Sequence, residues 1–219
     1  ISPAILDQRL PGRVNVSGKL SGQRDDTDKW QIVADSFRIT GLRNDRPIEA
    51  TLRAAMSDSA LSLNGEAAYD KNRVSIDGHI NQTLDIHSHV QLLNPQSFHP
   101  DLRGVADVYL HLSGSRSEPL LDIDASSSRM GFSQYTIEDV EIHGRQLGLL
   151  SDQMQLSATS NDILYYNRSL LNSTEIQFQG SHDKHVLSWS LHQQAAQLFG
   201  TVRGGMKNIA AGWNGTLDQ

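Results

Sequence analysis

The sequence predicts an all-β protein built as one elongated, curled sheet of antiparallel or mixed strands. Over most of the 219-residue chain, apolar residues alternate with polar ones at the two-residue period of a strand. Helical spacing is weak, and only residues 2–10 and 94–102 are candidates for a short helical turn. Apolar residues make up 37% of the chain and aromatic residues 6%, which is low for a compact domain and suits a shape with much surface per residue.

Seven segments share one template, which reads apolar, any residue, apolar, polar, glycine. Alternate residues of a strand share a face, so the two apolar residues and the glycine are expected on one side and the polar residues on the other. The template occurs as VNVSG (14–18), FRITG (37–41), LSLNG (61–65), VSIDG (74–78), LHLSG (110–114), VEIHG (140–144) and IQFQG (176–180). Longer alternating runs are IEATLRAAM (48–56), LDIHSHVQL (84–92) and VLSWSLH (186–192). In all, the alternation predicts about sixteen strand segments.

Glycine and proline are expected to mark where these strands begin, end or kink. Glycine allows positive φ and a close approach of backbones, so the template glycines are expected where strands end or kink. Pro47 and Pro119 are expected at the first residue of a strand, where the missing N–H does least harm.

Internal similarity predicts a single continuous β segment built from two units of about 100 residues, 10–101 and 102–219. LPGRVNVSGKLSG (10–22) is similar to LRGVADVYLHLSG (102–114), and NRVSIDGHI (72–80) is similar to TEIQFQGSH (174–182). WQIVADSFRITG (30–41) and the stretch ending YTIEDVEIHG (135–144) are expected to fill equivalent places.

Composition excludes several classes of partner. The formal net charge is −6 without a basic stripe, which argues against nucleic-acid binding. The chain has no cysteine, so neither disulfides nor thiolate metal sites can form. No apolar run approaches the roughly 20 residues of a membrane-spanning helix. Because the chain begins ISPAIL and ends WNGTLDQ within the alternating pattern, we expect it to be excised from a larger protein, with any membrane anchor outside this segment.

A sheet with one apolar face must cover that face. A closed β-sandwich or barrel is one solution, and an open curled sheet whose apolar interior forms a groove is the other. Medium-sized aliphatic side chains, the absence of key-strand features of a sandwich, and many short segments favour the open groove. Its predicted lining is Leu61, Leu63, Val74, Ile76, Leu84, Ile86, Val108, Leu110, Leu112, Ile123, Ile142, Ile176, Phe178, Trp189 and Leu191.

The ordered succession of motifs resembles the TamB family, which belongs to the AsmA-like bridge proteins. It consists of W-x-I…FRITGL…RPIEATL (30–52), LSLNG…NRVSIDGHI (61–80), LRGV…LHLSGSxxxPLL (102–121) and HVLSWSL…LFGTVRGG…WNGTL (185–217). The resemblance implies a U-shaped "β-taco" in the periplasm, within a protein anchored in the inner membrane of a Gram-negative bacterium. It also implies phospholipid acyl chains as cargo, the outer-membrane barrel TamA as a partner of the full-length protein, and a role in outer-membrane biogenesis. The family brings no catalytic residues.

Candidate reactive motifs have simpler interpretations. His87 and His89, with His79 nearby, lack a third ligand for zinc and are expected on a solvated polar face. Asp122 and Asp124 share the polar face of one strand.

Two further motifs are expected outside strand interiors. The Ser181…Lys184 spacing is expected in a turn. YYNRSLL (165–171) is expected at a strand edge or loop tip. We therefore expect no enzyme, no cofactor and no metal. The alternative function is a structural or adhesive β-sandwich or solenoid that binds protein partners and no lipid.

Overall fold

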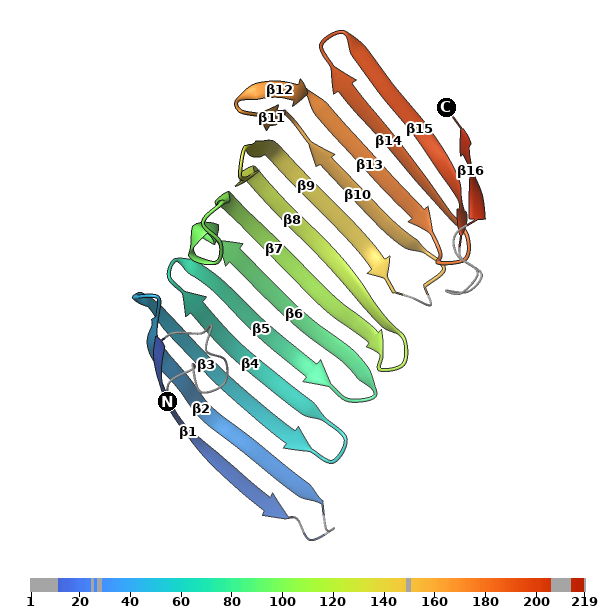
Figure 1. Cartoon of the computed structure of the whole chain (residues 1–219). Coiled ribbons are helices and arrows are strands. Elements are labelled where there is room, and N and C mark those ends of the chain that lie inside the picture. The colour runs from blue at the N-terminus through green and yellow to red at the C-terminus, as the bar shows by residue number, and fades with distance from the viewer. Residues whose placement is uncertain (1–11, 25, 27–28, 149–150, 206–213, 219) are drawn as a thin grey trace.

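The computed structural model shows a single sixteen-stranded antiparallel sheet that winds from one end of the chain to the other (Figure 1). The structure describes residues 12–24, 26, 29–148, 151–205 and 214–218. Strands β1 to β10 and β13 to β16 pair in chain order, while β11 pairs with β9 and with β12 at the side of this ladder. Every strand pair described is antiparallel. The predicted all-β, elongated and curled sheet is confirmed, and it is antiparallel rather than mixed.

The strands follow the predicted alternating segments. Their bounds are β1 (Gly12–Arg24), β2 (Trp30–Arg43), β3 (Arg46–Ser57), β4 (Leu61–Tyr69), β5 (Asn72–Ile80), β6 (Thr83–Leu92), β7 (Leu102–Ser115), β8 (Pro119–Phe132), β9 (Tyr135–Leu147), β10 (Met154–Ser160), β11 (Ile163–Tyr165), β12 (Arg168–Leu171), β13 (Ser173–Gly180), β14 (His185–Gln193), β15 (Ala196–Gly205) and β16 (Asn214–Asp218). Since β1 and β16 stand at opposite ends of the pairing order, the sheet is not closed into a barrel.

Short turns rather than glycines end most strands. Asn44 and Asp45 join β2 to β3 with φ of 50° and 60°, and Tyr166 and Asn167 join β11 to β12 with φ of 48° and 59°. Two successive positive φ values characterise the two-residue turn whose twist matches an antiparallel pair, and Asn and Asp tolerate them best.

The expectation that the template glycines lie where strands end or kink holds for some of them and is wrong for others. Gly114 is next to the last residue of β7 and has φ of 92°, and Gly18 lies at the register shift between Ser17 and Lys19 of β1. Gly41, Gly65 and Gly144 lie inside β2, β4 and β9, whereas Gly180 does end β13. At Gly144 an added Cβ would lie 2.7 Å from Cδ1 of Leu147 and 3.5 Å from Cδ1 of Leu156. Glycine at this position therefore makes room for neighbouring apolar side chains, which is a packing role rather than a turn role.

The predicted positions of the prolines and of the helical turns are partly confirmed. Pro119 is the first residue of β8, but Pro47 is the second residue of β3, after Arg46. Of the two helix candidates, residues 94–102 contain one turn of 3-10 helix, η2 (Pro95–Ser97), and residues 2–10 lie outside the described residues.

The sheet exposes much more surface than a compact protein would. Its accessible surface is 14900 Å², whereas a compact protein of this mass would expose about 10,000 Å². None of the hydrophobic residues that the structure describes is buried. At about 4.8 Å per strand, the fourteen-strand ladder spans roughly 65 Å. The molecule is therefore an extended single layer, without a second layer over either face in the described part of the chain.

The predicted repeat can be placed on this ladder. The described part of residues 10–22 lies in β1 and residues 102–114 lie in β7, while residues 72–80 lie in β5 and residues 174–180 in β13, so both pairs are six ladder positions apart. The third pair falls in β2 and β9, seven positions apart, so its two members run in opposite directions. This third pair is not at equivalent positions, and the two-unit organisation stays a prediction.

Replacing Gly104 by alanine should loosen the pairing of β7 with β8. Gly104 has φ of 106°, and an added Cβ would overlap the carbonyl oxygen of Arg129 on β8. We expect a loss of about 1–3 kcal/mol in local stability, measured as faster amide hydrogen exchange in β7 and β8. Gly22→Ala is the matched control, because its Cβ would make only ordinary contact, 3.8 Å from the oxygen of Gln31. Equal exchange rates in the two variants would contradict this account of Gly104.

Candidate functional site

All fifteen residues predicted to line a groove project from one face of the sheet. Residues paired across antiparallel strands lie on the same side, and the pairing connects the fifteen positions strand by strand from β4 to β14. We call this side the apolar face, and the opposite side the polar face. The alternation in the sequence thus predicted the common face, while lining a groove for lipid stays a prediction.

The apolar side chains form rows that run across the strands. The first row is unbroken from β2 to β14: Ile39, Ala50, Ala67, Val74, Val90, Val108, Ala125, Ile142, Ala158, Ile176 and Trp189. The second row is Phe37, Leu52, Gly65, Ile76, Ser88, Leu110, Ile123, Gly144, Leu156, Phe178, Leu187, Val202 and Leu217. At the usual strand spacing, the first row is about 50 Å long.

The second row contains one polar side chain, Ser88, whose hydroxyl is engaged by the sheet itself. Its Oγ donates a hydrogen bond to the carbonyl oxygen of Ser75, at 2.9 Å. Because the hydroxyl is already bonded to the neighbouring strand, Ser88 interrupts the row less than a free hydroxyl would.

The rows are accessible from solvent. Val74 is 37% and Ile176 is 38% exposed in the first row, and Leu52 is 44% exposed in the second. Exposed apolar area of this extent is unusual for a soluble protein surface and marks a site of interaction. The apolar face is therefore the main candidate site of the molecule.

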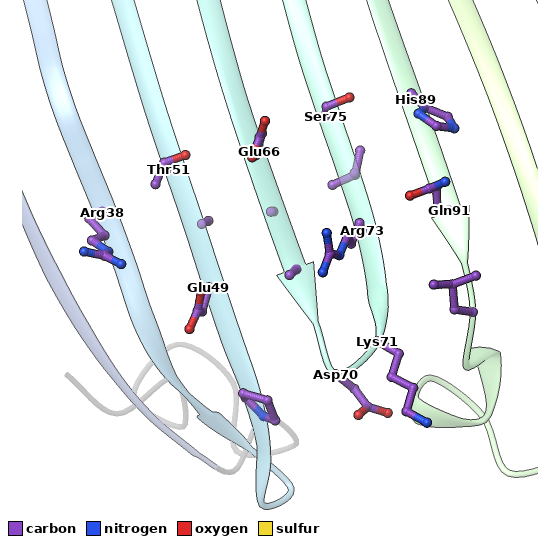
Figure 2. Close-up of a pocket in the computed structure, with 16 residues that line it drawn as sticks. Arg38, Glu49, Thr51, Glu66, Asp70, Lys71, Arg73, Ser75, His89 and Gln91 are labelled. Carbon is purple, nitrogen blue, oxygen red and sulfur yellow. The ribbon is translucent and has the colours of Figure 1, made fainter.

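A separate hollow lies on the polar side, near the turn between β4 and β5 (Figure 2). Its volume is about 730 Å³, and charged side chains of both signs line it, among them Arg38, Glu66 and Arg73. Of the fifteen predicted lining residues only Val74 contributes to it. This hollow is consequently not the predicted groove.

Comparison with known proteins identifies the family. The sequence model of a family described as "TamB, N-terminal domain" matches residues 1–219. The chain belongs to the TamB family. A relative from Haemophilus influenzae, "Translocation and assembly module subunit TamB", is 19% identical over 217 residues, which cover 98% of this chain and 16% of the relative. The chain thus spans about a sixth of the length of that relative. No solved structure matches the chain.

In this TamB-family chain, no helix of the described residues is long and apolar enough to span a membrane. The Ser181…Lys184 spacing forms a turn between β13 and β14, in which Ser181 N donates to the carbonyl oxygen of Lys184 at 2.8 Å. Tyr166 is 64% exposed and occupies the tip of the β11–β12 hairpin. The turn and the hairpin tip were both predicted, and residues 168–171 of the second motif form β12, which pairs with β11 at the side of the ladder.

The polar face of this TamB-family sheet carries an unexpected concentration of histidine–aspartate pairs. His87 and His89 project from it, as the alternation predicted. His89 Nε2 lies 2.7 Å from Oδ1 of Asp107, and His87 Nε2 lies 3.1 Å from Oδ1 of Asp85. The register also places His111 of β7 opposite His87, which the sequence gave no means of foreseeing.

Asp124 forms another such pair on β8. Arg145 Nη2 donates a hydrogen bond to Asp124 Oδ1 at 2.7 Å, and His143 Nδ1 lies 2.7 Å from the same oxygen. The hydrogen bond from Arg145, followed by that from His143, holds the pKa of the Asp124 carboxyl below its ordinary value. Asp122 lies two residues away, and its Oδ1 accepts a hydrogen bond from the backbone N–H of Gln146 at 2.7 Å.

Removing Arg145 should raise the pKa of Asp124. In the native sheet, the lowered pKa of Asp124 stabilises the fold at pH values above about 3.9, the ordinary pKa of the carboxyl. This contribution is lost as the pH falls through the pKa of Asp124 in the folded protein. In Arg145→Gln, the Asp124 carboxyl should titrate at higher pH, as followed by carboxyl-carbon NMR. The control is Arg129→Gln. The guanidinium of Arg129 pairs with Glu138 rather than with Asp124, so its removal should leave the titration of Asp124 unchanged. An unchanged Asp124 titration in Arg145→Gln would refute the assigned cause.

Proposed function

We propose that this chain is part of a periplasmic bridge that carries phospholipid between the inner and outer membranes along its apolar face. In this role it supports outer-membrane biogenesis and protein assembly as part of the translocation and assembly module. The observation that carries the proposal is the first row, eleven consecutive strands without a polar residue. Family membership supports it, because the relative's name refers to that module.

The energetic need for such a surface is large. Each CH₂ group exposed to water costs about 0.8 kcal/mol, so an unshielded sixteen-carbon acyl chain costs on the order of 12 kcal/mol. A row about 50 Å long exceeds the roughly 30 Å thickness of a bilayer's hydrocarbon core. An acyl chain lying along the rows would therefore keep apolar contact over its whole length.

The composition of the rows suits movement better than capture. Most members of the first row are Ala, Val or Ile, side chains of medium or small size. Because the face is uncovered, a charged headgroup can stay in water while the acyl chains follow the rows. Successive positions along a row then offer similar binding energy, which favours sliding.

The remaining parts of the function belong to the full-length protein. We propose that its inner-membrane anchor and its contact with the outer-membrane barrel TamA lie outside this chain. Carrying lipid along a surface makes and breaks no covalent bond, so we propose that the chain is not an enzyme and uses no cofactor.

Placing a charge in the first row should block transport. Ile176→Asp places a carboxylate among the apolar side chains of the row, and the aspartate side chain is too short to reach past them. Covering this charge with an acyl chain should cost on the order of 2.5–3.5 kcal/mol. That cost slows passage about a hundredfold, measured as phospholipid transfer to the outer membrane by the full-length protein. Since Ile176 is 38% exposed, the fold should survive the change.

The control for Ile176→Asp is its neighbour on the other face. Gln177→Asp introduces the same charge into the same strand, but on the polar side, where Gln177 pairs with Ser157 and Ser188. It should transport as the wild type does. Normal transport by a well-expressed Ile176→Asp protein would contradict the proposal.

Direct contact with lipid should also follow the faces of the sheet. A photo-cross-linking amino acid at Leu112, on the apolar face, should capture phospholipid in the full-length protein, whereas the same group at Ser113 should not. Capture of protein and no lipid at Leu112 would favour the alternative, a structural or adhesive sheet that binds protein partners.

A further inference from the structure

The strongest unexplained cluster of the molecule lies on the polar face, where β6 meets β7. His87 and His111 stand directly opposite each other in the register. Their imidazole rings are stacked, with centroids 4.1 Å apart and planes 6° from parallel. Both rings direct Nε2 toward one carboxylate oxygen, Oδ1 of Asp85, at 3.1 Å from His87 and 2.9 Å from His111.

These three side chains bring their donor atoms together at the spacing of a metal-coordination shell. One ligand atom from each of Asp85, His87 and His111 lies within 4.8 Å of the other two. Ligands about 2.0–2.1 Å from a tetrahedral Zn²⁺ ion stand roughly 3.3 Å from each other. The two nitrogen–oxygen distances are close to that value, and the partly exposed side chains leave freedom for the small adjustment that remains.

Further groups around the cluster support a cation. His79 Nε2 lies 3.9 Å from Oδ2 of Asp85, the other oxygen of the same carboxylate, and adds a third imidazole beside the cluster. Asp77 is the register partner of His87, and Asp122 is the register partner of His111. Carboxylates therefore flank the stacked histidines on both neighbouring strands and add negative charge beside the position of the ion.

We propose that Asp85, His87 and His111 form a binding site for a divalent transition-metal ion on the polar face. Imidazole nitrogen combined with carboxylate oxygen suits Zn²⁺, Cu²⁺ or Ni²⁺ rather than Mg²⁺ or Ca²⁺. The bound ion would join β6 to β7, strands connected by residues 93–101 rather than by a tight turn. The site is independent of lipid transport, because it lies on the face opposite the apolar rows.

The test is Zn²⁺ binding by the purified full-length protein, measured as stoichiometry in equilibrium dialysis and as affinity by calorimetry. His111→Gln and His87→Gln should each lower the affinity at this site at least about tenfold and remove one equivalent of Zn²⁺. X-ray absorption of the wild-type complex should show imidazole scattering. Zinc should also slow amide exchange in β6 and β7 of the wild type and not in His111→Gln.

His143→Gln is the matched control. His143 is an exposed histidine of the same face that pairs with a carboxylate, Asp124, but no second imidazole is stacked on it. This variant should bind Zn²⁺ as the wild type does. The proposal is overturned if the wild type takes up no Zn²⁺ at micromolar concentration, if His111→Gln retains full stoichiometry, or if His143→Gln loses as much as His111→Gln. Circular dichroism of each variant verifies that the sheet is intact.

Discussion

The backbone hydrogen-bond ladder between consecutive antiparallel strands is the interaction on which the rest of this structure depends. None of the hydrophobic side chains that the structure describes is buried, so the fold has no interior of the usual kind to organise it. Along the ladder from β1 to β16 each interior strand is held by its two neighbours, while β11 and β12 pair at its side. Stability in such an architecture is approximately a sum of nearest-neighbour terms, as in other repeat-built proteins. Side chains on the two faces are correspondingly free to serve other purposes.

The ladder also explains why the apolar residues lie in rows. Strand alternation decides the face of each residue, and the register between strands decides which residues become neighbours across them. Val90, Val108 and Ile142 are far apart in sequence, yet they occupy one row because the three strand pairings between β6 and β9 keep a common alignment. Small register shifts are absorbed without disturbing this alignment. One lies between Val105 and Asp107, outside the part of β7 that contributes to the first two rows.

The sequence predicted what depends on local pattern and missed what depends on register. Alternation alone placed all fifteen lining residues on a common face, since the parity of a strand needs no knowledge of its partner. The side chains that surround His87 could not be predicted in this way. Its stacked partner, His111, lies 24 residues further along, beyond a connection with a 3-10 turn whose geometry fixes the pairing and leaves no signature in composition. The role of Gly144 was misjudged for a related reason, because the space that it leaves for Leu147 and Leu156 exists only once the strands are paired.

The two faces of one thin sheet impose opposite requirements on neighbouring residues. Ile86 belongs to the apolar face, and the residues on either side of it, Asp85 and His87, form the histidine–carboxylate cluster on the other. A shift of one residue in the β6–β7 register would exchange these environments, bringing charge into the rows and apolar side chains into the cluster. The cluster and the rows therefore depend on the same alignment, although each acts on its own side of the sheet. An ion that fixes β6 against β7 would hold the polar ligands in place, and the same pairing keeps Ile86 beside Leu112 on the apolar face.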